Sequence, residues 1–263
     1  MDLKKIKHAG IVTIPSLFTM GNIGCGFFSI MASINGQYSK AGWLIFIAML
    51  LDTFDGRVAR MLNAESSFGV EMDSLADLIS FCTAPAFLIY YIALQNDPFG
   101  MQIAFLFVLF GAIRLARFNA MAHAGKSSKI YFTGLPVPAA AAVLVSFAIS
   151  YNIFAFDANG KIMPFMTNYL PHIRSAIAFI TIGLAFLMVS NVPYAAFKGK
   201  KEHKEGKERK ITVTKLAAIA IIIALLFKYP QDVVFIVFGL YALIGLLMFI
   251  FKAFKNIGKK EEE

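Results

Sequence analysis

The chain has 263 residues, of which 58% are hydrophobic and only 16% charged, and its mean hydropathy is +0.68. These values exclude an ordinary soluble domain and indicate an integral membrane protein. The net charge of +9 does not indicate a nucleic-acid partner, because the densest basic run, KGKKEHKEGKERK at 198–210, lies between two apolar segments and fits a positively charged loop at a membrane surface.

Eight apolar segments are long enough to cross a bilayer core, which takes about 20 residues of α-helix. In chain order they are roughly 12–35, 38–61, 70–95, 99–122, 134–156, 172–197, 211–229 and 232–252. We therefore predict an all-α fold, a polytopic membrane bundle of about eight transmembrane helices. The first residues, MDLKKIKHAG, alternate basic and apolar side chains and predict a short interfacial segment before the first span.

Lysine and arginine residues are distributed unevenly between the loops. With eight spans and a cytoplasmic N-terminus, 21 of the 25 lie on the cytoplasmic side. Cytoplasmic loops of membrane proteins carry such an excess of positive charge. The sequence therefore predicts a multi-pass protein of the cytoplasmic membrane, with both termini and the connection at 62–68 on the cytoplasmic side.

Four aspartates lie inside or at the edges of the second and third apolar segments: Asp52, Asp55, Asp73 and Asp77. Each charged group in a transmembrane helix costs about 2.5–3.5 kcal/mol on insertion scales, so four together need a compensating partner. The two aspartates of each segment are separated by only about 40–60° around a helix, so each pair occupies one face. If the two helices pair antiparallel through the connection at 62–68, the four carboxylates converge.

Converging carboxylates repel one another unless cations lie between them, and two divalent cations would balance four negative charges. Oxygen ligands without a nearby histidine or cysteine favour Mg²⁺ or Mn²⁺ over Zn²⁺. The two cysteines, Cys25 and Cys82, are isolated within spans and fit helix packing. The sequence therefore predicts a site for two divalent cations, Mg²⁺ or Mn²⁺.

Small residues lie one helical turn from the aspartates and clear space beside them: Gly56, Ala59 and Gly69. A planar base or a pyrophosphate could approach the helix backbone there, with Arg60 facing the phosphate oxygens. A lone glycine in a membrane helix more often permits close helix packing. Beside four spaced aspartates, a binding role is favoured.

The run DTFDGRVARMLNAESSFGVEMDSLAD, residues 52–77, matches the signature of the CDP-alcohol phosphotransferase family, D-x2-D-G-x2-A-R-x8-G-x3-D-x3-D, at every defined position. This resemblance implies a helical membrane enzyme, usually a homodimer, that uses two divalent metal ions to transfer a phosphatidyl-type group from a CDP-linked lipid to an alcohol. With the charge and hydropathy pattern, we therefore expect a catalytic membrane domain at 1–197, preceded by a short interfacial segment, a basic cytoplasmic loop at 198–210, and a C-terminal helical hairpin with a charged tail at 211–263.

The resemblance also implies roles for individual residues. The metal ions would be held by the four aspartates, of which the last is also the base for the acceptor hydroxyl: Asp52, Asp55, Asp73 and Asp77. The pocket for the CDP-linked lipid would be lined by Asp52 and the small and basic residues of the same run: Gly56, Ala59, Arg60 and Gly69.

Three further stretches resemble the membrane-bound phosphatidylserine synthases of bacteria and archaea: IPSLFTMGNIGCGFFSI, RLARFNA and YFTGLPVPAAAA. This resemblance covers roughly 11–195 and implies L-serine as the acceptor, with a diacylglycerol or archaeal ether lipid in the donor. Thr19 and Asn22, one turn apart in the first stretch, are expected to face the CDP-lipid pocket. Lone polar residues in a span more often form hydrogen bonds between helices.

Serine carries a carboxylate, so its pocket should supply a cation. Arg114 and Arg117 are three residues apart on one face at a helix end, with Asn119 and Lys126 close behind in the sequence. These four residues are the predicted acceptor and phosphate site. Arginines at a membrane boundary also serve as positive-inside anchors, and Arg117 fits that role equally well.

Two alternatives are open. Because the core signature is shared, glycerol 3-phosphate or an inositol phosphate could be the acceptor instead of serine. A cation transporter also places aspartates in the membrane, but it predicts carboxylates at mid-membrane on several spans, often with repeat symmetry. Here all four aspartates lie in one pair of segments beside a predicted cytoplasmic connection, which favours the enzyme.

Overall fold

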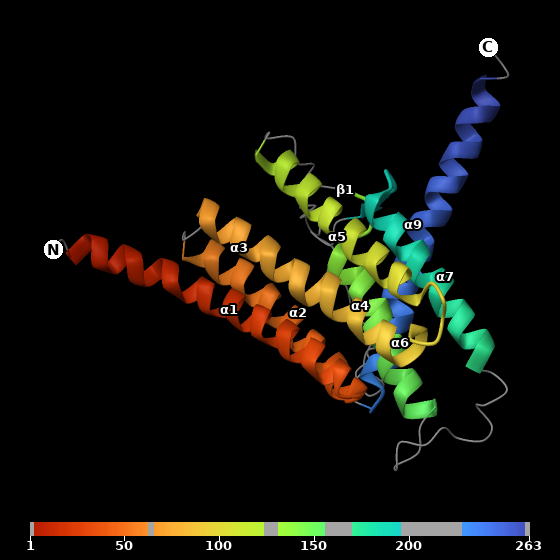
Figure 1. The fold of residues 1–263 in the computed structure, drawn as a ribbon. Helices are drawn as coiled ribbons and strands as arrows, with labels where there is room; N and C mark the ends of the chain where they lie inside the picture. Colours follow the sequence, from red (N-terminus) through yellow and green to blue (C-terminus); the bar gives the residue numbers. More distant parts are fainter. Residues whose placement is uncertain (1–2, 63–65, 124–130, 156–169, 196–227, 261–263) are drawn as a thin grey trace, which may run out of the picture.

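Helices make up nearly all of the chain that the computed structural model describes, which is residues 3–62, 66–123, 131–155, 170–195 and 228–260 (Figure 1). The α-helices are α1 (Leu3–Ile34), α2 (Tyr38–Met61), α3 (Ser67–Asp77), α4 (Ala84–Ile89), α5 (Gly100–His123), α6 (Val137–Ala155), α7 (Leu170–Val189) and α9 (Pro230–Lys260). Two π-helical segments, η1 (Leu78–Thr83) and η2 (Tyr90–Leu94), continue α3 and α4. The predicted all-α class is confirmed, apart from two three-residue strands, β1 (Tyr131–Thr133) and β2 (Pro193–Ala195).

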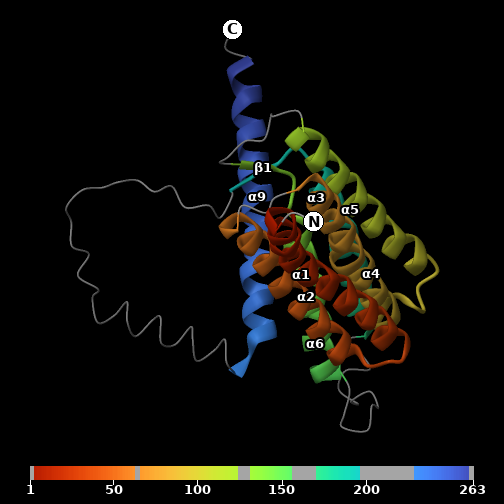
Figure 2. The same ribbon diagram turned by 90° about the vertical axis from the view of Figure 1, so that its left-hand side faces the viewer.

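α1 and α2 lie side by side in both views (Figures 1 and 2). They are joined by a tight turn in which Gly36 has a φ of +72°, a left-handed backbone conformation that residues with a side chain rarely adopt. Across the pair, the Ser29 hydroxyl donates a hydrogen bond to the carbonyl oxygen of Ala41 at 2.9 Å. This packing sets the level of α2 relative to α1, so that Thr19 lies opposite Asp55.

The third apolar segment forms a continuous helical rod from α3 to η2. It begins at Ser66, whose hydroxyl accepts a hydrogen bond from the backbone N–H of Gly69 at 3.0 Å and so caps the helix. The π-helical segment η1 starts directly after Asp77 and ends just before Pro85. A proline inside a helix lacks an N–H donor and clashes with the preceding turn. A wider π-helical turn at that point accommodates Pro85.

Among the long apolar helices in the described residues, α6 is the most buried, and it packs against α9, α2 and α4. Its first half is rich in alanine, and small side chains let membrane helices approach closely. The contact with α2 is so close that a Cβ atom on Gly42 would lie 2.5 Å from Cγ1 of Ile149. The helices that carry the aspartates are therefore held against a tightly packed centre.

The two strands were not predicted from the sequence. They pair antiparallel, with Phe132 opposite Tyr194, and so connect the chain before α6 to the chain after α7. Gly134 follows β1 with a φ of +84°, and a Cβ atom there would lie 2.3 Å from the carbonyl oxygen of Met188. The predicted sixth span, 172–197, therefore ends as a helix at Val189 and continues as an extended segment.

Within the described residues, five helices are long and apolar enough to cross a membrane: Ser16–Ile34, Phe68–Leu94, Gly100–Met121, Val137–Ala155 and Pro230–Ile250. The chain is therefore membrane-embedded, but the predicted count of about eight spans is not confirmed. α2, which carries two of the aspartates, is not among the five, and Ser175–Val189 is a shorter apolar helix. The predicted span at 211–229 falls almost entirely outside the described residues. α1 runs unbroken from Leu3, so the predicted interfacial segment is part of it.

Candidate active site

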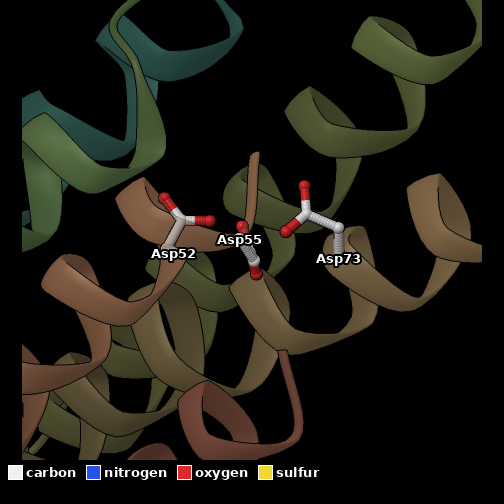
Figure 3. Close-up of side chains that lie close together, drawn as sticks. All are labelled: Asp52, Asp55 and Asp73. Carbon is white, nitrogen blue, oxygen red and sulfur yellow. The ribbon is translucent and has the colours of Figure 1, made fainter. Parts of the chain in front are cut away.

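Three of the four aspartates form a compact cluster (Figure 3). Asp52 and Asp55 come from α2 and Asp73 from α3, and one oxygen from each lies within 4.8 Å of the others. Asp55 is buried, whereas Asp52 and Asp73 are half-buried. Both helices pack against α1, and this arrangement brings the predicted faces together. Three carboxylates at this spacing form an all-oxygen donor set of the kind that hard divalent cations prefer.

Asp77, the last residue of α3, lies beside this cluster. Its carboxyl group is within hydrogen-bonding reach of Asp52 and in electrostatic contact with Asp73. One oxygen of Asp77 and one of Asp73 are buried and have no hydrogen-bond partner within the described part of the chain. Buried carboxylate oxygens without partners are costly, so these two atoms fit a site that is completed by a cation or a substrate.

α1 contributes two polar residues to the same region. The Thr19 hydroxyl donates a hydrogen bond to Oδ2 of Asp55 at 3.1 Å, with both side chains buried. One turn later, the Asn22 side chain is fully buried, and neither polar atom of its amide has a partner among the residues described. The backbone carbonyl of Asn22 accepts a hydrogen bond from the Ser80 hydroxyl at 2.9 Å. Thr19 therefore orients a carboxylate, and Asn22 offers a free donor and a free acceptor.

The small residues predicted for the CDP-lipid pocket lie at the end of α2 and the start of α3. Gly56 is exposed, and a Cβ atom on it would meet only the tip of the Arg60 side chain at 3.9 Å. Nε of Arg60, also exposed, donates to the carbonyl oxygen of Gly56 at 2.7 Å. Ala59 is half-buried, and Gly69 lies in the capped first turn of α3. The end of α2 and the start of α3 therefore leave backbone accessible at Gly56, next to the positive charge of Arg60.

Arg114 is the buried cation of the site, with 9% of its surface exposed. It projects from α5, and its guanidinium interacts with the negative charge of Asp77. The ring of Phe118 lies 6.0 Å from the guanidinium carbon. Nε of Arg114 is buried without a hydrogen-bond partner in the described residues. A buried guanidinium with an unused donor is suited to an anionic ligand.

Arg117 has a different environment, although it lies only one turn from Arg114. Its Nη1 donates to the carbonyl oxygen of Val189 at 3.2 Å, and its Nη2 donates to Oδ1 of Asn191 at 2.8 Å. Val189 is the last residue of α7, whose final carbonyl groups lack partners within the helix. Arg117 therefore ties α5 to the end of α7, and two of its donors are used in doing so.

Asn119 connects α5 to α3. Its amide nitrogen donates to Oγ of Ser74 at 2.9 Å, its amide oxygen accepts from the same hydroxyl at 3.2 Å, and a longer bond of 3.4 Å reaches Glu71. Lys126, the last predicted acceptor residue, falls outside the described residues. Sequence reasoning missed Ser74 and Asn191 as partners, although each is a polar residue in or beside an apolar segment.

Five buried side-chain atoms lack a hydrogen-bond partner in the described structure, and all belong to Asn22, Asp73, Asp77 and Arg114. Each of these residues was singled out from the sequence. Elsewhere in the described chain, buried side-chain donors and acceptors are paired, as is usual in folded proteins. The atoms left for a ligand are therefore confined to residues of the predicted site.

A family model agrees with this site. Residues 12–189 match the model of the CDP-alcohol phosphatidyltransferases, and this range contains all four aspartates and Arg114. The chain belongs to the CDP-alcohol phosphatidyltransferase family. The family resemblance read from the aspartate motif, together with the enzyme class that it implied, is confirmed.

Individual relatives extend the similarity beyond the family core. The chain is 35% identical over 250 residues to the CDP-diacylglycerol–serine O-phosphatidyltransferase of Helicobacter pylori, covering 94% of this chain and 95% of that protein. It is 36% identical over 201 residues to the archaetidylserine synthase of Methanothermobacter thermautotrophicus, covering 76% of each chain. The Bacillus subtilis CDP-diacylglycerol–serine O-phosphatidyltransferase is 36% identical, covering 70% of this chain and 91% of that protein.

Proposed function

We propose that this chain transfers a phosphatidyl-type group from a CDP-linked lipid, with diacylglycerol or an archaeal ether lipid, to the hydroxyl of L-serine, forming a phosphatidylserine-type lipid and CMP. The observation that carries the proposal is Arg114, a buried cation with an unpartnered donor in electrostatic contact with Asp77. In serine, the carboxylate carbon and the hydroxyl oxygen are three covalent bonds apart, roughly 3–4 Å, so one molecule can contact a cation and a nearby base. The names of the three relatives support the same acceptor.

Two divalent cations, Mg²⁺ or Mn²⁺, would be held by Asp52, Asp55, Asp73 and Asp77. The fit rests on the three clustered carboxylates and on the unpartnered buried oxygens of Asp73 and Asp77. When bound, divalent cations would polarise the phosphoryl oxygens and stabilise the negative charge on departing CMP. Thr19 holds one carboxylate in place through its hydrogen bond to Asp55.

Asp77 is the proposed base. As the serine oxygen forms its bond to the β-phosphorus, on the lipid side of the pyrophosphate, the bond from that phosphorus to the CMP oxygen breaks, and the serine proton passes to the Asp77 carboxylate. General-base assistance of this kind contributes about 10²–10⁴-fold. Arg114 would bind the serine carboxylate. Because its guanidinium interacts with the charge of Asp77, serine bound in this way would direct its hydroxyl toward Asp77.

The CDP-linked donor would bind on the open surface formed by Gly56, Ala59 and Gly69, next to Asp52. Support comes from the exposed backbone at Gly56 and from Arg60, which lies on the same surface and can reach phosphate oxygens. Asn22 would supply the unpartnered amide on the α1 side of the pocket. Amide groups can both donate to and accept from a nucleobase or a phosphate.

In the membrane, we propose eight spans, with the aspartate site and both termini on the cytoplasmic side of the cell membrane. The catalytic domain would occupy 1–197, followed by the basic loop at 198–210 and a C-terminal hairpin and tail at 211–263. The distribution of lysine and arginine supports the proposed sidedness, and five of the eight proposed spans coincide with long apolar helices. From the family resemblance, we also propose a homodimer embedded in membrane lipids.

The test is CMP release by the purified full-length protein with CDP-diacylglycerol, Mg²⁺ or Mn²⁺, and a panel of alcohols. L-serine should be consumed with release of one CMP per lipid product, and ethanolamine and serinamide, which lack the carboxylate, should be poor acceptors. If the protein consumes glycerol 3-phosphate or an inositol phosphate and ignores serine, the family chemistry stands and the serine assignment is wrong.

A further inference from the structure

The helix α5 runs antiparallel to the helical rod that extends from α3 to η2, and a turn at 95–99 joins the two (Figure 1). α5 packs against η1, α4 and η2 along this rod. α5 carries Arg114, whereas the rod carries Asp73 and Asp77. The position of α5 along the rod therefore decides whether the proposed acceptor cation lies beside the proposed base.

Gly111 is the first point at which α5 is fixed against the rod. A Cβ atom on Gly111 would overlap Sγ of Cys82 in η1 and would lie 3.2 Å from the Cβ of Cys82. Cys82 is itself fully buried, so its side chain has little room to move away. Small residues let membrane helices approach closely, and glycine is the residue that allows this contact between α5 and η1.

The second point lies about two turns further along α5, at Asn119. Its amide nitrogen donates to Oγ of Ser74 at 2.9 Å, and its amide oxygen accepts from the same hydroxyl at 3.2 Å. Ser74 directly follows Asp73 and lies about one turn before Asp77. The pair formed by Ser74 and Asn119 therefore links α5 to the stretch of α3 that carries two of the four aspartates.

The two contacts are equally spaced on the two helices. Ser74 and Cys82 are eight residues apart on the rod, and Gly111 and Asn119 are eight residues apart on α5. Because each helical residue advances by a nearly constant rise, two antiparallel helices keep one register only when such spacings match. The two contacts therefore belong to a single register of α5 against α3 and η1.

Asp77 and Arg114 both lie between these contacts. Asp77 is three residues after Ser74, and Arg114 is five residues before Asn119, so the register places them two residues apart along the axes, or about 3 Å. Arg114 is also three residues after Gly111, about 60° around α5, and so lies on the side that packs against η1. The interaction of its guanidinium with the charge of Asp77 agrees with this placement.

We infer that Gly111 and the pair formed by Ser74 and Asn119 are positioning residues of the acceptor site, which hold α5 in the register that places Arg114 beside Asp77. Asn119 then acts through Ser74, in place of the direct contact with the acceptor that the sequence predicted. The inference rests on the proposed binding of the serine carboxylate by Arg114, and it adds the residues that set the distance between that cation and the base.

The first test is Gly111→Ala in the full-length protein, alone and combined with Cys82→Ala. The new methyl group should push α5 away from η1 and raise the KM for serine by about 10-fold or more, because a misplacement of about 1 Å can cost about 100-fold. The KM for CDP-diacylglycerol and the kcat/KM for serinamide should not change. Adding Cys82→Ala removes the overlapping sulfur and should restore most of the affinity for serine.

Gly183→Ala on α7 is the matched control, because a Cβ atom there meets nothing within 4 Å. Both glycine substitutions favour the helical state equally, so only Gly111→Ala should raise the KM for serine. An unchanged KM for serine in Gly111→Ala, an equal rise in the KM for the lipid, or no recovery when Cys82→Ala is added would overturn the inference.

The second test is a double-mutant cycle with Ser74→Ala and Asn119→Ala. Each change should raise the KM for serine by roughly 3- to 10-fold, the range expected for one hydrogen bond between neutral groups. The double variant should be no worse than either single variant, because all three lack the same link. If Asn119 instead binds serine directly, Asn119→Ala will be the more damaging change and the two effects will add, which contradicts the inference.

These variants also separate this inference from the proposed function. If Gly111→Ala abolishes folding, judged by its melting temperature, the cycle between Ser74 and Asn119 decides. If the wild type ignores serine, the proposed function fails, and this inference fails with it. If Arg114→Ala raises the KM for serine selectively and none of the positioning variants does, only this inference fails.

Discussion

Replacing Arg114 with alanine tests the acceptor site most directly. The side chain is 9% exposed, and its Nε has no partner in the described chain, so its charge is available to a ligand in a water-poor environment. Loss of a hydrogen bond to a charged group typically costs about 1.5–3 kcal/mol, which corresponds to roughly 10- to 150-fold in affinity. We therefore expect Arg114→Ala to raise the KM for serine by that factor and to leave the KM for CDP-diacylglycerol nearly unchanged.

The assay is CMP release at saturating Mg²⁺, with serine and lipid varied in turn and serinamide as a second acceptor. Arg114→Lys keeps the charge but loses the planar fork, so it should recover only part of the serine affinity. Arg117→Ala is the comparison on the same helix, and it should mainly lower the melting temperature, because it removes two hydrogen bonds to the end of α7. If Arg114→Ala weakens the lipid donor and leaves serine unaffected, Arg114 belongs to the phosphate site and the reasoning is refuted.

Three further outcomes are expected. Asp52→Asn should abolish nearly all CMP release without preventing membrane insertion. A chelator should abolish CMP release by the wild type until Mg²⁺ or Mn²⁺ is added. Full turnover of Asp52→Asn in metal-free buffer would contradict the metal site. Thr19→Val should raise the Mg²⁺ concentration for half-maximal activity by about 10-fold or more, because the bond to Asp55 is lost, whereas Thr19→Ser should restore it. A cysteine at Lys204 should resist an impermeant thiol reagent added outside intact cells, and labelling there would reverse the proposed topology.

The carboxylate cluster could be predicted from the sequence because it depends on local rules. A spacing of three or four residues keeps two side chains on one helix face, and a short connection makes neighbouring helices antiparallel. Asp52, Asp55 and Asp73 converge for these reasons. Asp77 follows by the same periodicity, and it stays beside the cluster because the helical geometry changes only after it, at η1.

The distinction between Arg114 and Arg117 could not be predicted in this way. Both residues lie at the same helix end, and nothing in the run RLARFNA separates them. What separates them is the neighbouring structure, because Arg117 meets the end of α7 and Asn191, whereas Arg114 is buried and its guanidinium interacts with the charge of Asp77. These partners are more than 30 residues away in the sequence. Contacts set by the packing of distant helices leave no local signal.

The number of membrane spans could not be predicted from hydropathy alone. Apolar length identified α2 and the segment at 172–197 as spans, but α2 carries Asp52 and Asp55, and the second segment turns into β2 after Val189. Hydropathy measures the average cost of placing a segment in lipid. It does not register charges that a neighbouring helix compensates, as Thr19 does for Asp55 through its hydrogen bond. For this reason α2, which carries two of the site's aspartates, is not among the five helices that qualify as spans by length and composition.

Hydrogen-bond pairing distinguishes polar residues that join two elements of this bundle from buried residues that keep atoms available for a ligand. Asn119 is paired with Ser74, and Arg117 with Asn191, and each pair joins two elements. Asn22, Asp73, Asp77 and Arg114 instead keep buried atoms without partners in the described chain. An unpaired buried polar group costs about 1–3 kcal/mol, so such groups rarely persist without a use. These four residues lie on three different helices, α1, α3 and α5. A ligand that forms hydrogen bonds or ion pairs with all four would therefore link those helices to one another.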